Sequence, residues 1–476
     1  MKRLFFWALL GVWCVTISAQ NKQLAVLSVN DMHANLDYMP RLAAMVDSLR
    51  TIYPDMLVFS AGDNRTGNPF NDMYATPALP MTMLMNAVGF NASAVGNHEW
   101  DSGIAGFRTL INQANFRHLC ANANIPDTMR LHLFPYHFFK SGNVRVGVLG
   151  CIQIGANGIP DTHPKNVQGI TFTDAADIIP QYAWMRQQCD VFILLSHNGY
   201  EADTALAKRF PFFDAIIGGH THTRVEGTEL HNGVLVTQAE NRLKWATLSI
   251  FTLDNNGHII DKQARLLNIQ TFNHEKQEVK ELLNTYNHND FFERQIGTAT
   301  RAFLNAEELG CFMADAIRFE YNADIALQNY GGVRRSTFPA GPITVKDILE
   351  LDPFGNEVVE FTLTGEEVYQ LLLACQFADD KKAPYVSGIT YEMTFDKNDI
   401  TKVTKLVVRT EDGRKLDLKK KYKVLVSSYV AAICKYKHAD PGHNTFQKTS
   451  DVLMNYIEKK KNIDYQGVTR IKWLKK

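Results

Sequence analysis

The fold is decided by MLVFSAGDN, residues 56–64, and ASAVGNHEWD, residues 92–101. In both, an apolar run leads into a glycine and then into polar side chains, as expected where a buried strand ends in a sharp turn. Three further apolar runs also lead into polar side chains, the last of them through two glycines: LAVLSVNDMH at 24–33, VFILLSHNG at 191–199 and DAIIGGHTH at 214–222. Five such turns in succession predict a core of strands whose ends gather polar side chains at one rim.

Seven of the polar residues at these turns have metal-binding side chains. They are Asp31, His33, Asp63, Asn97, His197, His220 and His222. Carboxylate and amide oxygens combined with imidazoles suit Zn, Mn, Co or Fe and do not select among them. Asp63 has two carboxylate oxygens, so we expect it to bridge two divalent ions. Asp31 and His33 alternate by two, so both side chains should point to the same side if the strand pleat persists.

A pair of such ions indicates hydrolysis of phosphate esters. Two metals ~3.5–4 Å apart clamp phosphate oxygens and turn a bound water into hydroxide near neutral pH. His98 follows Asn97 directly and is placed to meet the phosphate or the leaving oxygen. Asp101, three residues later, can orient that imidazole. We therefore expect His98 and Asp101 to be catalytic.

The composition limits the other functions. The chain has 476 residues, 45% of them apolar, which predicts two or three domains. Lys+Arg and Asp+Glu both number 50, so a net charge of zero argues against nucleic acid as a partner. Six cysteines follow residue 19 without a C-x-x-C pair. We expect most of them to be buried small residues, and the sequence does not pair any disulfide.

The N-terminus is typical of an export signal. Lys2 and Arg3 precede an apolar run from 4 to 17, and Ser18 and Ala19 supply the small residues of a cleavage site. Residues 1–19 are therefore expected to be a signal peptide, and the protein to be periplasmic or on the cell surface. The run is short for a membrane span, so we expect no stable membrane anchor, with an uncleaved anchor as the alternative.

The rest of the chain divides in two. From about 23 to 270, apolar strands alternate with helical segments, which indicates an α/β domain with sheets buried on both faces. Residues 274–290 are charged and helical without a strong apolar face, as in a linker. A new α+β arrangement starts at Gln295, where Asn305 and Glu308 form a capping pair at the start of a helix.

The ordered motifs resemble those of the calcineurin-like metallophosphoesterases. The second half resembles the C-terminal domain of the bacterial 5′-nucleotidase/UDP-sugar hydrolase family through NYGGVRR at 329–335, PAGPITVKDILELDPFGN at 339–356 and LTGEEV at 363–368. The resemblance implies a four-layer α/β/β/α sandwich, followed by a smaller α+β substrate-binding domain. The corresponding boundaries are 23–272 for the first domain, 273–294 for a linker helix and 295–476 for the second.

The resemblance also implies roles for individual residues. The first metal is expected on Asp31, His33, Asp63 and His222, and the second on Asp63, Asn97, His197 and His220. His98 and Asp101 match the catalytic dyad. The substrate pocket is expected to include Asn329, Gly332, Arg334 and Phe354, because an Arg fork pairs with phosphate and a Phe ring stacks on a base.

The sequence departs from the family in the substrate-binding half. A Gly-Gly-Asp-Gly stretch carrying a second stacking aromatic is replaced by SSYVAAICKYKHADPGH at 427–443. Either Tyr429 or Tyr436 could stack instead, and the sequence does not choose between them. An arginine expected near 305 has only Arg301 as a candidate, and Glu240 replaces the glycine of a common QAG segment.

The expected activity is phosphate release from nucleoside 5′-monophosphates. UDP-sugars and cyclic nucleotides are rival substrates, and a thioester-sulfate or phosphodiester hydrolase on the same metals is a second hypothesis. A binding protein with a degenerate domain is a third, which the full set of ligands argues against. The sequence leaves monomer and dimer open. A substrate site between the domains would close by hinge motion near 274–295.

Overall fold

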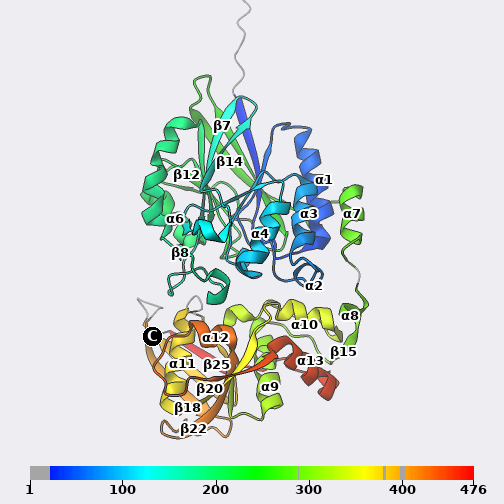
Figure 1. Cartoon of the computed structure of the whole chain (residues 1–476), viewed down its shortest axis with the longest axis vertical. Helices are drawn as coiled ribbons and strands as arrows, with labels where there is room; N and C mark the ends of the chain where they lie inside the picture. The colour runs from blue at the N-terminus through cyan, green and yellow to red at the C-terminus, as the bar shows by residue number, and fades with distance from the viewer. Residues whose placement is uncertain (1–21, 288, 379–381, 397–401, 476) are drawn as a thin grey trace, which may run out of the picture.

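The computed structural model describes residues 22–287, 289–378, 382–396 and 402–475. The chain folds into two halves, one above the other in Figure 1. The first half contains two six-stranded sheets packed face to face. In the order of the sheet, the first consists of β14 (Ile259–Asn268), β13 (Trp245–Leu253), β1 (Lys22–Val29), β2 (Leu57–Ser60), β3 (Ala92–Ala94) and β4 (Arg117–Leu119).

The central strands of the second sheet are parallel. Helices cover the outer face of each of the two sheets. Its order is β11 (Leu230–His231), β12 (Val234–Thr237), β10 (Ala215–Ile217), β9 (Val191–His197), β7 (Val144–Ile152) and β6 (Tyr136–Ser141). Apolar residues of both sheets, such as Phe59 and Ile193, form one core between them. Helices α1 (Met39–Arg50) and α3 (Leu79–Val88) lie outside one sheet, and α6 (Tyr200–Arg209) outside the other. The expected four-layer α/β/β/α sandwich is confirmed.

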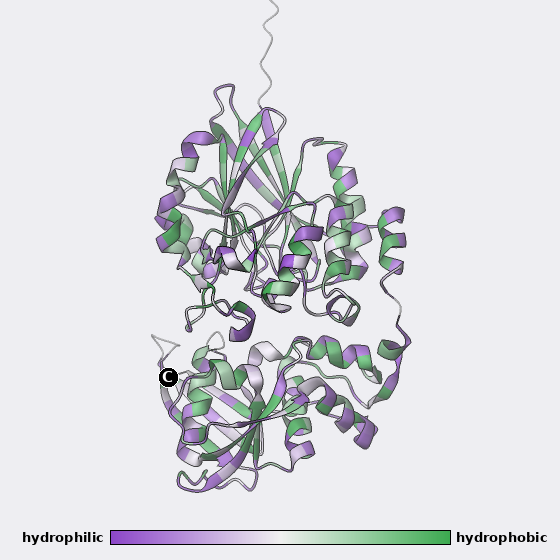
Figure 2. Ribbon diagram, viewed as in Figure 1, coloured by the Kyte–Doolittle hydropathy of each residue, from purple (hydrophilic) through white to green (hydrophobic). Residues whose placement is uncertain are grey.

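Helix α1 illustrates how the sequence specifies these layers. Pro40 lies in its first turn, where a missing N–H costs nothing. Leu42, Met45, Val46 and Leu49 follow at helical spacing and are all buried. In Figure 2 the outer helices show hydrophobic and hydrophilic stretches in alternation, as expected for helices with one buried face.

The second half is an α+β domain. Its main sheet has the order β19 (Tyr385–Ser387), β16 (Ile325–Gln328), β22 (Lys421–Ser427), β18 (Glu357–Thr364) and β23 (His443–Lys448). Two three-stranded sheets accompany it: β17 (Gly341–Thr344), β15 (Gln295–Ala299) and β24 (Asn462–Ile463), and β21 (Val403–Thr410), β20 (Ile389–Phe395) and β25 (Ile471–Lys475). The longer helices are α9 (Ala306–Tyr321), α11 (Gly365–Ala378) and α13 (Thr449–Lys460), and α10 (Val345–Leu351) and α12 (Ser428–Ile433) are short.

Helix α9 begins at the predicted cap. The Asn305 side chain accepts a hydrogen bond from the Glu308 N–H at 3.0 Å. In a standard capping box the Glu308 carboxylate would accept a hydrogen bond from the Asn305 N–H. Here it accepts from the Leu304 N–H instead.

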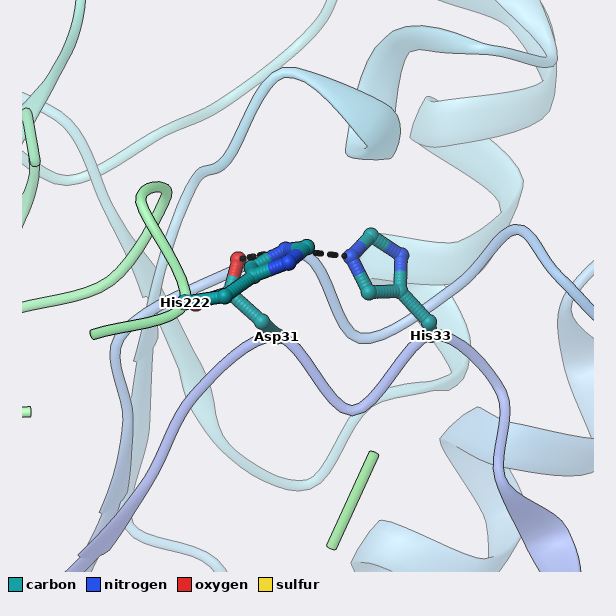
Figure 3. A group of neighbouring side chains, drawn as sticks. All are labelled: Asp31, His33 and His222. Carbon is teal, nitrogen blue, oxygen red and sulfur yellow. Dashed lines mark hydrogen bonds and ion pairs between the residues drawn. The ribbon is translucent and has the colours of Figure 1, made fainter. Parts of the chain in front are cut away.

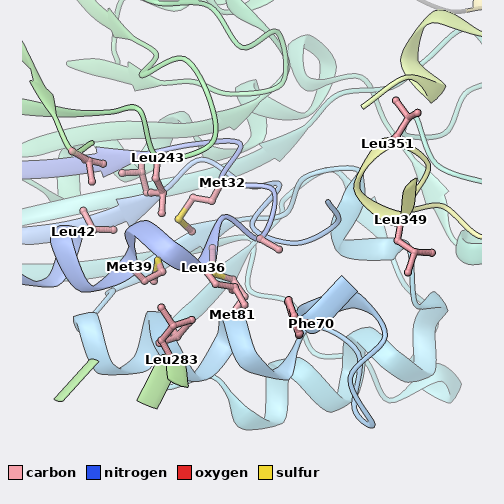
Figure 4. Packing of buried hydrophobic residues seen from close by; sticks show 14 of the residues in the cluster. Met32, Leu36, Met39, Leu42, Phe70, Met81, Leu243, Leu283, Leu349 and Leu351 are labelled. Carbon is pink, nitrogen blue, oxygen red and sulfur yellow. The ribbon is translucent and has the colours of Figure 1, made fainter. Parts of the chain in front are cut away.

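The segment between the halves differs from expectation. Helix α7 (Gln277–Asn284) does have an apolar face, since Val279 and Leu283 are one turn apart and buried. It packs against α1 and α3, so it extends the helical layer of the first half. Figure 4 shows Leu283 in the same hydrophobic cluster as Phe70 of the first half and Leu349 of the second. The expectation of a helix without a strong apolar face is therefore wrong.

The expected signal peptide, residues 1–19, lies outside the described residues. Among the helices that the structure describes, none is long and apolar enough to cross a membrane. The six cysteines among the described residues are all buried, in agreement with the expectation of small buried residues. Cys375 and Cys434 are nevertheless neighbours, with 2.8 Å between their sulfur atoms.

His118 on β4 should make stability depend on acidity. Its ring is buried between those of Phe107 and Phe116, and burial lowers its pKa to about 4. The unfolded chain takes up this proton near pH 6.5 and the folded chain only near 4, so folding is destabilised as pH falls through that window. The free energy of unfolding should fall between pH 7.5 and 4.5 in both proteins. In His118→Leu this fall should be about 2–3 kcal/mol smaller than in wild type. Urea unfolding of metal-free protein measures the difference, and equal losses would contradict it.

Candidate metal centre

The predicted ligands all lie where strands end. Asp31 follows β1, Asp63 follows β2 and Asn97 follows β3, while His197 is the last residue of β9 and His220 follows β10. These strand ends meet at one rim of the two sheets. Each of three sets has one ligand atom per residue within 4.8 Å of the others: Asp31–His33–His222, Asp31–Asp63–His197 and His33–Asp63–His98.

The backbone at these residues is unusual. Asp31, His33, Asp63, His220 and His222 all have positive φ, between 45° and 79°. Residues other than glycine rarely adopt this left-handed region, and such strain persists only where the surrounding structure enforces it. The pleat argument for Asp31 and His33 is therefore wrong. Their side chains converge because the chain leaves the strand in left-handed turns.

A glycine makes room for the central carboxylate. A Cβ on Gly96 would lie 2.2 Å from Asp63 Oδ1. The buried Glu99 carboxylate then holds both turns, because it accepts hydrogen bonds from the N–H groups of Asp63, Asn64 and Gly96 at 3.0, 2.9 and 2.6 Å. Sequence reasoning missed Glu99, although its place beside His98 in GNHEWD was a usable signal.

Asp31, His33 and His222 form the first cluster (Figure 3). The Nε2 atoms of His33 and His222 are 3.0 Å apart, and Asp31 Oδ1 lies 3.5 Å from His222 Nε2. His33 Nδ1 donates to the Thr66 carbonyl, so its Nε2 lone pair faces the cluster. The Arg334 guanidinium already approaches this nitrogen at 3.0 Å. Converging lone pairs and a buried carboxylate fit a divalent cation.

Asp63, Asn97, His197 and His220 form the second cluster. His197 Nε2 lies 3.3 Å from Asp63 Oδ2 and 3.2 Å from Asn97 Oδ1, which is 3.1 Å from His220 Nδ1. Burial opposes a charge on His197, but the carboxylates of Asp63 and Asp31 raise its pKa to about 10. A divalent cation bound at this cluster would neutralise the negative charge of these carboxylates. The donor sets of the two clusters therefore both fit divalent metal ions.

The predicted dyad is assembled beside the clusters. His98 Nδ1 lies 2.8 Å from Asp101 Oδ2, which also accepts from Thr66 Oγ1 at 2.6 Å. Burial opposes a charge on His98, but Asp63 and Asp101 outweigh it and raise the pKa of the imidazole. The Phe354 ring is stacked on His98, with centroids 5.6 Å apart. The imidazole is thus oriented and biased toward its charged form.

A cavity of about 430 Å³ lies between the two halves. The first half contributes Asp63, Asn97, His98, Asp101, Asp161, His220 and His222 to its lining. The second half contributes all four predicted pocket residues, Asn329, Gly332, Arg334 and Phe354. Tyr429 also lines the cavity, whereas Tyr436 packs on His438. Arg301 pairs with Asp464 instead of lining this cavity.

Comparisons with known proteins agree with this architecture. Residues 24–224 match the family profile of calcineurin-like phosphoesterases, and residues 290–435 match that of the 5′-nucleotidase C-terminal domain. The chain belongs to the calcineurin-like phosphoesterases that carry a 5′-nucleotidase C-terminal domain. It is accordingly a phosphoric ester hydrolase.

Individual relatives span most of the chain. It is 27% identical to a 5′-nucleotidase of Vibrio cholerae, over 95% of this chain and 94% of that protein. It is 26% identical to the trifunctional nucleotide phosphoesterase YfkN of Bacillus subtilis, over 86% of this chain but only 32% of that longer protein. A solved 5′-nucleotidase precursor of Thermus thermophilus superimposes with a TM-score of 0.84 at 25% identity, covering 95% of this chain and 99% of that one.

Proposed function

We propose that the protein is an exported two-metal phosphohydrolase that releases phosphate from nucleoside 5′-monophosphates. One observation carries this proposal: the rim that gathers the ligand clusters opens into a cavity whose other wall holds Arg334 and Phe354. Metal, phosphate and base sites would then line one cavity. The relatives in Vibrio and Thermus named as 5′-nucleotidases support this substrate class.

The two metals are assigned to the two clusters. Asp31, His33, Asp63 and His222 would hold one ion, and Asp63, Asn97, His197 and His220 the other. When bound, two divalent cations supply Lewis-acid charge that polarises the phosphoryl group and lowers the pKa of water at the site.

The chain's own residues orient the substrate. His98 lines the cavity, with its Nδ1 held by Asp101, and would donate a hydrogen bond from Nε2–H to the phosphoryl or leaving oxygen. Arg334 would pair with phosphate oxygens through its fork of N–H donors. Phe354 and Tyr429 offer aromatic faces to the nucleobase.

Hydrolysis of a nucleotide sugar or cyclic nucleotide is the second candidate. Lys165 and Lys382 line the same cavity in addition to Arg334, so it offers positive charge for a second phosphate group. Chromatographic product analysis with AMP, UMP, UDP-glucose, NAD and cyclic AMP, each with added Mn, Zn or Co, tests both candidates, because cleavage of the last three substrates releases no inorganic phosphate. We expect AMP and UMP to give the highest kcat/KM. Hydrolysis of UDP-glucose or NAD alone would support the second candidate and contradict the first.

Tyr429 should be the second base-stacking residue. Because stacking on an aromatic ring contributes ~1–3 kcal/mol per base, we expect Tyr429→Ala to raise the KM for AMP by about tenfold or more. The KM for ribose 5-phosphate, which has no base, should change little. Tyr436→Phe is the matched control and should leave both KM values unchanged. Equal effects of Tyr429→Ala on the two substrates would contradict the assignment.

A further inference from the structure

Asp161 contacts two residues that are proposed ligands of the same metal. It lies in the turn after β7 and lines the cavity. Its Oδ2 is 3.6 Å from His220 Nε2, and its backbone carbonyl accepts a hydrogen bond from Asn97 Nδ2 at 3.1 Å. A Cβ on Gly155 would lie 2.5 Å from Asp161 Oδ1, so that glycine leaves the room in which the carboxylate sits.

The carboxylate selects which nitrogen of His220 carries the proton. A neutral imidazole has one N–H and one lone pair, and the partner of one nitrogen determines the state of the other. With a carboxylate facing Nε2, the proton stays on Nε2. Nδ1, which lies 3.1 Å from Asn97 Oδ1, then has its lone pair available for a cation at the second cluster.

The Asp161 carbonyl selects the end of the Asn97 amide in the same way. An amide has a donor end and an acceptor end, and only the oxygen can bind a cation. Because the carbonyl accepts from Nδ2, Oδ1 is turned toward His197 Nε2 at 3.2 Å. A single residue thus orients two neighbouring ligands.

The same turn also reaches the dyad. Thr162 Oγ1 donates to Asp101 Oδ1 at 3.3 Å, and Asn166 Nδ2 donates to Thr162 Oγ1 at 3.1 Å. The turn therefore has a fixed position relative to both the second cluster and His98.

We propose that Asp161 is a positioning residue whose carboxylate fixes the ligand atom of His220 for the second metal. The proposal rests on the metal assignment of the proposed function. Residues outside the ligand set that orient a ligating histidine typically contribute 10–100-fold to metal affinity. Asp161 should therefore act on the second metal and not on the first.

Metal titration of the apoprotein tests this role without using activity. Asp161→Ala, Asp161→Asn and wild type are titrated with Co²⁺ and followed by calorimetry and by the visible absorption of bound cobalt. We expect Asp161→Ala to bind the second equivalent about 10–100-fold more weakly and the first one unchanged. Asp161→Asn should lie between, because its amide oxygen can still face Nε2–H but carries no charge. Asp177→Ala, which removes an exposed carboxylate of the same half, should match wild type.

The outcomes separate this inference from the proposed function. If Asp161→Ala and Asp161→Asn bind both equivalents as wild type does, the role of Asp161 is wrong. If Asp161→Ala fails to fold, the nearly isosteric Asp161→Asn decides alone. If wild type binds two metals but hydrolyses no phosphate ester, the proposed function fails while the role of Asp161 stands.

A separate observation concerns Cys375 on α11 and Cys434 at the end of α12. Both are buried, and their sulfur atoms are 2.8 Å apart. A disulfide requires ~2.05 Å between the sulfurs, so a small side-chain movement closes the gap. Helix α12 also carries Tyr429, and its Ile433 carbonyl accepts from Asn157 Nδ2 of the first half at 3.5 Å.

We infer that Cys375 and Cys434 form a disulfide that fixes α12 to α11. The two thiols lose two protons and two electrons to the disulfide of a thiol oxidant, which is reduced to two thiols. Because both sulfurs are buried in the folded domain, this exchange belongs to the folding chain. The bond would hold the helix that presents Tyr429 to the cavity.

Refolding the full chain in a glutathione redox buffer tests the disulfide. Peptide mapping without reduction should recover one cross-linked peptide pair containing Cys375 and Cys434. Reduction should lower the Tm by roughly 5–10 °C in wild type and leave that of a Cys375→Ser, Cys434→Ser double variant unchanged. Alkylation of both cysteines in unreduced, denatured protein would overturn the inference.

Discussion

His98→Ala is expected to lower kcat for AMP by about 10²–10⁴-fold while both metals remain bound. The reason lies in its contacts: Nδ1 is engaged by Asp101, and the ring faces the cavity beneath Phe354. An imidazole held in this way is suited to donating a proton or hydrogen bond to the substrate rather than to binding a cation. Metal analysis of the purified variant, together with kcat, measures both parts of the prediction.

The geometry also offers a rival role for His98. Its Nε2 is 3.8 Å from Asp63 Oδ2, and His33, Asp63 and His98 each place a ligand atom within 4.8 Å of the others. If His98 were a ligand, His98→Ala would lose metal along with activity. Asp101→Asn is the useful companion, because it should lower kcat and retain both metals. Loss of one metal in His98→Ala would end the catalytic assignment.

Asp63→Ala is expected to remove both metals and to lower kcat/KM by at least about 10³-fold. Its carboxylate is the proposed shared ligand, and the charge stabilisation lost with the metals amounts to several kcal/mol of barrier. Asn97→Ala is the matched control, because Asn97 belongs to the second cluster alone and should cost only one metal. Metal content of the two variants after gel filtration distinguishes these results. Equal losses in both would contradict the bridging role.

The strand ends could be predicted because they depend on local sequence. Val191–His197 and Ala215–Ile217 lie within the predicted runs at 191–199 and 214–222, since apolar runs between turn residues define a buried strand. The order of the ligands along the chain was equally local. The sequence could therefore indicate which side chains gather at the rim.

The predictions that were wrong depended on backbone geometry and on contacts between residues distant in the sequence. The pleat argument for Asp31 missed the left-handed turn, which a sequence pattern does not reveal. Helix α7 was misjudged because its buried face consists of Val279 and Leu283, and their burial depends on α1 and α3.

The contacts of Glu99 and Asp161 were missed for a related reason. Glu99 holds the turn at Asp63, which is 36 residues away in the sequence. The Asp161 carboxylate lies 3.6 Å from the His220 ring in the lining of the cavity. The choice between Tyr429 and Tyr436 likewise required the packing of α12 around the cavity. These contacts arise only from the assembled tertiary structure.

One measurement tests the central claim most directly: phosphate release from AMP by the apoprotein as Mn²⁺ is added in known molar ratio. Because Asp63 is proposed to join two ions in one site, activity should rise with added metal and reach its plateau at two equivalents per chain. A plateau at one equivalent, or no phosphate release at any ratio, would contradict the two-metal account.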